Sequence, residues 1–177
     1  MTISSGIDGS ALQPDCMTSM PNAHKPQLSS DAAVDVATAP RCVGDLMTTG
    51  VVQLLPHKPF REAVDLLAQN PFRHLIVAEA DGRIVGVISD RDVLRAASCY
   101  DSDTTLATDV MTPEPITVNV DTPISTAIAL VLDHRVSCLP VVDGDRRIQG
   151  IITTTDLLQT FQALQRYIEK TPNRPAA

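Results

Sequence analysis

Residues 86–92, with the sequence GVISDRD, recur 64 positions later as residues 150–156, with the sequence GIITTTD. Both copies place a glycine, two aliphatic residues, a hydroxyl residue and an aspartate at the same spacing. The aliphatic residues predict a strand, and a Ser or Thr three residues before an acidic residue is the pattern of a capping box at a helix N-terminus. The sequence therefore predicts two equivalent junctions, each leading from a strand into a helix.

The internal repeat covers most of the chain. The same offset aligns Asp45-Leu-Met47 with Asp109-Val-Met111 without a gap, and the positions between these motifs keep their character. Identical pairs include Pro59/Pro123, Ala63/Ala127, Leu66/Leu130, Leu75/Leu139, Val77/Val141, Asp81/Asp145 and Leu94/Leu158. Self-similarity at a fixed period indicates two copies of one structural unit.

Each copy predicts the same order of elements. A short strand comes first, followed by a helix, two strands joined by an Asp-Gly turn, and a closing helix. The predicted ranges are 51–55, 59–70, 74–79, 83–88 and a helix from Asp90 in the first copy, and 116–120, 123–134, 139–142, 147–152 and a helix from Thr154 in the second. Because a β-α-β-β-α unit covers only one face of its sheet, we expect an α+β fold in which the two copies share a core.

The predicted organisation has four parts: a disordered or flexible tail at 1–42, a first repeat at 43–104, a second repeat at 105–168 and a C-terminal tail at 169–177. The first part is rich in Ser, Thr, Asp, Ala and Pro and has no sustained hydrophobic period, which is typical of disorder. From Val43 onward, the chain shows the patterns of a folded domain.

Composition excludes several classes of function. The 177 residues carry a net charge of −7, and the 14 basic side chains are spread along the chain, so no basic patch for duplex nucleic acid is apparent. No apolar run approaches the roughly 20 residues of a membrane span, and the N-terminus lacks the pattern of a secretory signal. The four cysteines have no metal-ligand spacing and are sparse for a disulfide scaffold. We expect a cytoplasmic protein without a metal site.

The two S/T-x-x-D boxes are the strongest candidates for a binding site. No serine lies in a nucleophile elbow and no glycine-rich phosphate loop is present, so we assign no catalytic residue. A helix N-terminus attracts phosphate, a hydroxyl can bond to it, and an aspartate can accept the hydroxyls of a ribose. Gly86 and Gly150 are expected to let a ligand approach the backbone closely. The alternative interpretation is that each box only caps its helix.

The second repeat carries the clearest resemblance to a known family. Residues 111–158 read MTPEPITVNVDTPISTAIALVLDHRVSCLPVVDGDRRIQGIITTTDLL. Two tandem units that open with D-(L/V)-M-T and end in G-h-h-(S/T)-x-x-D closely resemble a pair of cystathionine-β-synthase (CBS) domains, the Bateman module. The resemblance covers about residues 43–168 and implies two repeats packed with pseudo-two-fold symmetry in a stand-alone CBS-pair protein.

This resemblance implies a regulatory, non-enzymatic protein that senses AMP, ADP, ATP or S-adenosylmethionine and requires no cofactor. It places two ligand clefts between the repeats. The first cleft would use Ser89, Arg91 and Asp92 with Ile116, Val136 and Ser137. The second would use Thr153 and Asp156 with Val52, Phe72, Arg73 and His74.

The resemblance also implies roles for these side chains. In the first cleft, Ser89 and Arg91 would face phosphate, Asp92 would face the ribose, and Ile116 and Val136 would face the adenine. In the second cleft, the basic side chains Arg73 and His74 would meet phosphate. Arg91 has only Thr155 opposite it, and the family's proline is present at Pro140 but replaced by Ile76, so we expect the clefts to differ.

The resemblance implies a homodimer stacked through its helices, and the apolar face at 157–168 is consistent with such an interface. We also expect a second binding partner, an unidentified protein that this chain regulates. Two alternatives remain open. The chain could be an interaction module with vestigial clefts that binds through its dimer surface or tail, or a nucleotide-hydrolysing enzyme.

Overall fold

The structure, a computed structural model, describes residues 39–170. Residues 1–38 of the tail predicted at 1–42 and residues 171–177 of the C-terminal tail predicted at 169–177 lie outside the described residues. Both repeats have the predicted mixture of helices and strands. The first repeat contains β1 (Gln53–Leu54), α1 (Phe60–Gln69), β2 (His74–Ala78), β3 (Ile84–Ser89) and α2 (Asp90–Ala96), and the second contains α4 (Ile124–His134), β5 (Cys138–Val142), β6 (Ile148–Thr153) and α5 (Thr154–Lys170). A short 3-10 helix, η1 (Val43–Asp45), opens the first repeat, and α3 (Ala107–Val110) and β4 (Thr112–Pro113) open the second.

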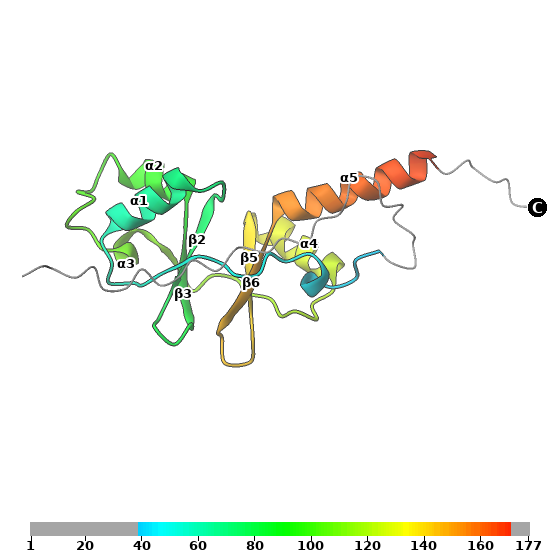
Figure 1. Ribbon diagram of the computed structural model, residues 1–177, viewed down its shortest axis with the longest axis horizontal. Coiled ribbons are helices and arrows are strands. Elements are labelled where there is room, and N and C mark those ends of the chain that lie inside the picture. The colour runs from blue at the N-terminus through cyan, green and yellow to red at the C-terminus, as the bar shows by residue number, and fades with distance from the viewer. Residues whose placement is uncertain (1–38, 171–177) are drawn as a thin grey trace, which may run out of the picture.

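Two antiparallel hairpins form the centre of the molecule. Strands β2 and β3 pair in the first repeat, and β5 and β6 pair in the second. Figure 1 shows the hairpins side by side, with α1, α2 and α3 outside the first and α4 and α5 outside the second. Apolar side chains from both hairpins form one buried cluster between them, made of Ile76, Ala78, Ile84, Val87, Val142 and Ile151. The shared core expected from the repeat is therefore present.

Proline sets the start of the two equivalent helices. Pro59 and Pro123 have φ values of −55° and −58°, and α1 and α4 begin directly after them. Proline is tolerated here because the first residues of a helix donate no intrahelical hydrogen bond. Ala63 and Ala127, four residues on, are fully buried, so each helix lays one face on its own hairpin.

The strand predicted at 116–120 is reduced to a single bridge. Val118 pairs in parallel with Val141, whereas its counterpart in the first repeat forms the two-residue strand β1 beside β2. The Val118 N–H still donates to the Pro140 carbonyl at 3.0 Å, and the Val142 N–H donates to the Val118 carbonyl at 2.9 Å. The chain therefore takes the position of an edge strand without the length of one.

The segments that open the two repeats are exchanged. Strand β4, which leads into the second repeat, pairs with β3 of the first, and Thr112 lies opposite Val87. Sixty-four positions earlier, Thr48 pairs with Ile151 of β6, in the second repeat, through hydrogen bonds of 2.9 and 3.0 Å. Each hairpin is thus extended by chain that belongs, in sequence, to the other copy.

The same exchange occurs at the helix ends. The Val43 N–H donates to the Thr122 carbonyl just before α4, and the Ala107 N–H donates to the Lys58 carbonyl just before α1, both at 2.8 Å. Val43 is fully buried in the core of the second repeat, and Ala107 is fully buried in the core of the first. The two cores are therefore each completed by the opposite repeat.

The second hairpin turn differs from its prediction. Asp143-Gly144 was expected to provide the residue with positive φ, but Gly144 has no positive φ, and Arg146 has φ of 61° instead. Arg146 is the repeat equivalent of Gly82, whose φ is 84°. The Arg146 N–H donates to the Asp143 carbonyl at 3.1 Å, just as the Gly82 N–H donates to the Glu79 carbonyl at 2.9 Å. The residue with positive φ therefore lies at the position that the repeat alignment gives, and not in the Asp-Gly pair.

Candidate functional site between the two repeats

Both S/T-x-x-D boxes form capping boxes. Asp92 Oδ2 accepts hydrogen bonds from the Ser89 N–H at 2.9 Å and from the Ser89 hydroxyl at 2.7 Å, and the Asp92 N–H donates to Ser89 Oγ at 3.3 Å. The equivalent bonds between Thr153 and Asp156 measure 2.8, 2.6 and 3.4 Å. These contacts satisfy backbone donors at the N-termini of α2 and α5. Each box therefore caps its helix.

The two aspartates differ in their exposure. Asp156 is 5% exposed and is the only buried charged residue within 39–170. The Asp92 side chain is 15% exposed, and its Oδ1 atom lies 3.6 Å from a guanidinium nitrogen of Arg95. Because the Arg95 side chain is 79% exposed, this ion pair is worth little and leaves the carboxylate available to another partner.

A hydrogen bond joins the repeats between the two boxes. His74 Nε2, at the start of β2, lies 2.8 Å from Ser137 Oγ, just before β5. On either side of this bond, the Asp90 N–H donates to the Arg73 carbonyl at 3.1 Å, and the Thr154 N–H donates to the Ser137 carbonyl at 3.0 Å. The N-termini of α2 and α5 are thereby attached to the segments that lead into β2 and β5.

The charges near this bond change the pKa values of two side chains. Burial lowers the pKa of His74, Arg73 and Arg91 lower it further, and Asp90 and Asp92 oppose them. Burial, together with the Asp92 carboxylate, raises the pKa of the Cys138 thiol to about 12. Ser89 of the first box pairs with His74 in the β2–β3 register, and His74 bonds to Ser137 of the second repeat, so the first box lies against the second repeat.

The structure therefore gathers part of the predicted first cleft. Ser89, Arg91 and Asp92 lie at the N-terminus of α2, and Ser137 lies nearby through its bond to His74. Arg91 and Arg73 are exposed. His74 was assigned to the second cleft, but its hydrogen bond to Ser137 and its pairing with Ser89 in the β2–β3 register place it beside the first box as well.

The predicted apolar contacts are partly core residues. Ile116 and Val136 are half-buried and pack against the core of the second repeat, and Val52 and Phe72 do the same in the first. Their remaining exposed surface is what a ligand could touch.

The expected role of the two motif glycines is wrong. A Cβ on Gly86 would lie 2.3 Å from Met111 Sδ, and a Cβ on Gly150 would lie 2.7 Å from the Thr48 carbonyl oxygen and 2.9 Å from Met47 Sδ. The glycines make room for the exchanged opening segments and not for a ligand. The repeated DLM and DVM motifs carry this signal in the sequence, because they place a methionine at the same position of both segments.

Two residues of the site were not anticipated from the sequence. Asp90 and Cys138 lie beside the predicted residues, and both act on or respond to the charges around His74 and Asp92. Among the described residues, no group of three or more His, Cys, Asp and Glu side chains is placed to hold a metal ion. None of the helices between residues 39 and 170 is long and apolar enough to cross a membrane.

Comparison with known proteins identifies the family. The sequence pattern of the CBS domain matches residues 43–98 and 107–163. An uncharacterized 17.7 kDa protein of Acidianus ambivalens is 29% identical over 119 residues, which are 67% of this chain and 72% of that protein. The chain spans only about a quarter of the length of the curated enzymes that it also matches, such as an inosine-5'-monophosphate dehydrogenase and a homoserine O-acetyltransferase.

Solved structures agree with the sequence match. CBSX2, solved in complex with AMP, is 29% identical with a TM-score of 0.62, covering 71% of this chain and 98% of that one. The CBS domain pair of protein MJ0100, solved with 5'-methylthioadenosine and S-adenosyl-L-methionine, is 25% identical with a TM-score of 0.65, covering 70% of this chain and 97% of that one. The chain belongs to the CBS domain family, and it contains two tandem CBS domains.

Proposed function

We propose that this protein is a regulatory, non-enzymatic CBS pair that binds an adenosyl ligand between its repeats and changes its own conformation, or that of a partner, in response. The observation that carries the proposal is the position of the first box. Asp92 lies at a helix N-terminus, beside a hydrogen-bonded pair that joins the two repeats. A ligand at this point would contact both repeats and could favour one arrangement of them over another.

The chemistry of the site suits a nucleoside with a charged or phosphorylated group. The α2 N-terminus, the Ser89 hydroxyl and Arg91 provide donors for phosphate. Asp92 would repel phosphate but can accept hydrogen bonds from ribose hydroxyls. The half-buried Ile116 and Val136 offer an aliphatic wall for the adenine. Adenosyl ligands bound to the similar structures of CBSX2 and MJ0100 support this choice of ligand class.

The second cleft is proposed with the same chemistry. Thr153 and Asp156 would take the roles of Ser89 and Asp92, and Arg73 would supply the charge that Thr155 lacks. Because Asp156 is more buried than Asp92, a ligand must displace more of the local packing to reach it. We therefore expect the second cleft to bind more weakly.

Calorimetric titration with AMP, ADP, ATP and S-adenosylmethionine, each alone, tests the proposal. Asp92→Asn and Asp156→Asn keep an oxygen that can accept the capping N–H but remove the charge that favours ribose hydroxyls. Each variant should weaken binding at one cleft by about tenfold, which corresponds to about 1.4 kcal/mol. Asp109→Asn is the matched control, because Asp109 also caps a helix, by accepting the Leu106 N–H at 3.0 Å, but lies in neither box.

Binding that is unchanged in both box variants, or binding of none of the four ligands, would contradict the proposal. A thermal-shift series gives an independent measurement, because a ligand at a hundred times its Kd adds about 2.7 kcal/mol to the free energy of unfolding.

One observation favours the interaction module as a second candidate. Both boxes already satisfy the backbone donors at their helix N-termini through capping, without help from a ligand. Large apolar side chains are exposed on the outer helices, including Leu94, Leu132, Leu158, Phe161 and Ile168. We propose that this surface forms a homodimer or meets a regulated protein in the cytoplasm. Sedimentation of wild type and Phe161→Glu would measure self-association, and a monomeric wild type would contradict the homodimer.

A further inference from the structure

The two hairpin turns form a second polar site away from the capping boxes. A cavity of about 680 Å³ is lined by Arg83, Ile84 and Val85 of the first repeat, by Glu114 and Pro115 after β4, and by Arg146 of the second turn. β3 begins at this cavity and ends at Ser89, so about five steps of 3.3 Å, or roughly 16 Å, separate it from the first box. The cavity is therefore separate from the capping-box end of the first cleft, and its Pro115 directly precedes Ile116, the proposed adenine contact of that cleft.

The cavity lies where the repeats touch through their backbones. The Ile84 N–H donates to the Arg146 carbonyl at 3.1 Å, and the Ile148 N–H donates to the Gly82 carbonyl at 3.0 Å. Arg83 and Arg147, which are repeat equivalents, face each other as a bridge pair. Like charges directly opposite each other are unfavourable. Arg147 has a carboxylate partner in Asp145, so Arg83 is the member of the pair whose charge an anion could offset.

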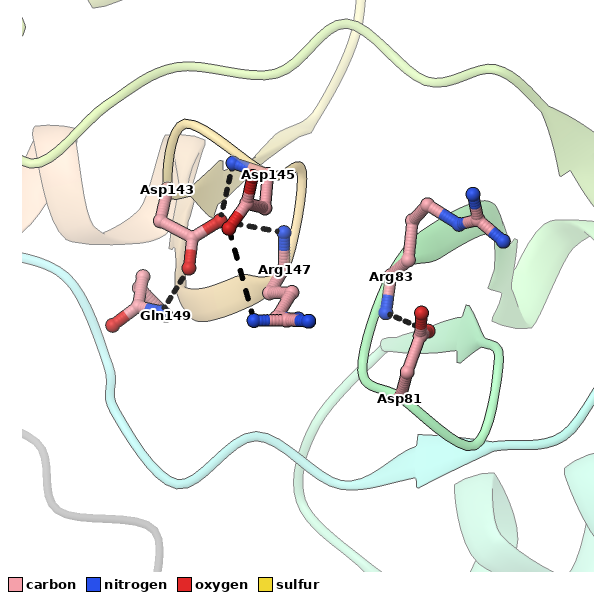
Figure 2. A network of polar contacts seen from close by, with 6 residues as sticks. All are labelled: Asp81, Arg83, Asp143, Asp145, Arg147 and Gln149. Atoms are coloured by element: carbon pink, nitrogen blue, oxygen red, sulfur yellow. Dashed lines mark hydrogen bonds and ion pairs between the residues drawn. The ribbon is translucent and has the colours of Figure 1, made fainter.

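The carboxylates of the second turn are already engaged, whereas Glu114, which lines the cavity, is not paired with them. Asp143 accepts hydrogen bonds from the Asp145 and Arg147 N–H groups at 2.9 Å and from Gln149 Nε2 at 3.3 Å. Asp145 pairs with Arg147 at 3.7 Å. Figure 2 shows this network in the second turn, separate from the first.

The two arginines of the cavity have no such partner. Asp81 accepts a hydrogen bond from the Arg83 backbone N–H at 3.1 Å, and Figure 2 shows the Arg83 guanidinium directed away from that carboxylate. Neither Arg83 nor Arg146 has an ion pair with any residue between 39 and 170. The site thus contains one uncompensated guanidinium from each repeat.

Two of the lining residues also have unfavourable backbone conformations. Glu114 has φ of 47° and Arg146 has φ of 61°, a region that residues other than glycine rarely adopt. Local strain of this kind is concentrated at binding and switch sites, where the surrounding structure maintains it. At Arg146 the strain is avoidable, because the equivalent turn has a glycine.

We propose that this cavity binds a small organic oxyanion, a phosphomonoester or a carboxylate, that also carries an amino or hydroxyl group. Arg83 and Arg146 bind the oxyanion from the two repeats, since guanidinium groups match its geometry. Glu114 accepts a hydrogen bond from the amino or hydroxyl group, and Ile84, Val85 and Pro115 contact the carbon chain. A bound ligand holds the two hairpin turns together and so stabilises the junction of the repeats.

Amide chemical shifts of the full chain, titrated at constant ionic strength with inorganic phosphate and separately with phosphoethanolamine, test the proposal. We expect saturable shifts at Gly82, Ile84 and Ile148, with dissociation constants of about 1 mM. Phosphoethanolamine should bind several-fold more tightly than phosphate. For the carboxylate class, the affinity for free glycine, which carries an amino group, is compared with the affinity for acetate, which does not.

Four variants separate specific binding from general charge effects. Arg83→Gln and Arg146→Gly should each weaken binding at least about fivefold, and glycine also suits the backbone of position 146. Glu114→Gln should strengthen phosphate binding and abolish the preference for phosphoethanolamine. Arg147→Gln is the control, because Arg147 is paired with Asp145, and it should bind like the wild type. The proposal would be overturned if no saturable shifts appear at the junction, or if Arg83→Gln and Arg146→Gly have no effect. An equal loss of binding in Arg147→Gln would also overturn it.

Discussion

His74 and Ser137 form a hydrogen bond of 2.8 Å that joins the two repeats and has no symmetric equivalent. The repeat offset places Cys138 at the position of His74 and Arg73 at the position of Ser137. The junction therefore carries an imidazole and a hydroxyl at one pair of equivalent positions, and a guanidinium and a thiol at the adjacent, symmetry-related pair. This difference gives the two proposed clefts different chemistry, although their capping boxes have the same geometry.

Replacing His74 should change the pH dependence of stability. Burial lowers the pKa of His74 below its usual 6.5, so the unfolded chain binds more protons than the folded one between the two values. The free energy of unfolding should therefore fall as the pH drops from 6.5 toward the lowered pKa, and remain constant in this respect above 6.5. Urea unfolding across this range should show a smaller loss for His74→Gln than for wild type. His134→Gln, at an exposed histidine, should keep the wild-type slope.

Cys138 should be unreactive in the folded protein. Its pKa of about 12 leaves almost no thiolate near neutral pH, and the thiolate is the reactive form. Cys99 is exposed and provides the internal comparison. Labelling with a thiol reagent, followed by peptide mass spectrometry, should modify Cys99 first and Cys138 only after unfolding. Early labelling of Cys138 would contradict its burial beside Asp92.

Adding a methyl group at the two motif glycines should have unequal consequences. Alanine at Gly150 meets the Thr48 backbone carbonyl, which cannot move without breaking its pairing with β6. Alanine at Gly86 meets only the flexible side chain of Met111. Denaturant unfolding should show a loss of about 1–3 kcal/mol for each single variant, with the larger loss in Gly150→Ala.

The matched double variants test the cause of this effect. Met111→Ala should restore part of the stability lost in Gly86→Ala. Met47→Ala should not rescue Gly150→Ala, because the Thr48 carbonyl is still in the way. Equal rescue of both would show that the methionines alone occupy the space at the glycines.

Glycine at position 146 should stabilise the second hairpin. A residue other than glycine at φ of 61° lowers the free energy of unfolding by about 1–2 kcal/mol. Replacing it with glycine removes this strain, but the greater conformational freedom of glycine in the unfolded chain offsets part of the gain. We expect Arg146→Gly to raise the free energy of unfolding by about 0.5–1 kcal/mol. Gly82→Ala, at the equivalent turn position, should lower it. A loss of stability in Arg146→Gly would show that the arginine side chain holds the turn.

Local features of the fold could be predicted from the sequence. The capping boxes form as expected, because all their donors and acceptors lie within three residues of each other. The helices after Pro59 and Pro123 and the paired hairpins were also predicted, because hydrophobic period and repeat offset indicate the same positions. The turn at 143–146 was misassigned where the Asp-Gly dipeptide and the repeat offset disagreed.

Contacts between distant segments could not be predicted. Thr48 pairs with Ile151 and His74 with Ser137, and neither pairing leaves a periodic signal in the sequence. The role of Gly86 and Gly150 was wrong for the same reason, since a glycine can make room for a ligand or for another part of the chain. The DLM and DVM motifs mark Met47 and Met111 as equivalent, but the contact of Met111 with Gly86 and of Met47 with Gly150 is visible only in the three-dimensional structure.

The exchange of opening segments determines when each repeat can finish folding during synthesis. Residues 43–48 leave the ribosome before any other part of the two repeats, but their partner strand β6 is made near the end. The hairpin of the first repeat, in turn, gains its outer strand only when β4 has been made. Neither half can therefore reach its final state alone, and the contacts that finish folding join residues far apart in sequence, which slows folding. We therefore expect the pair, and not the single repeat, to be the unit that folds.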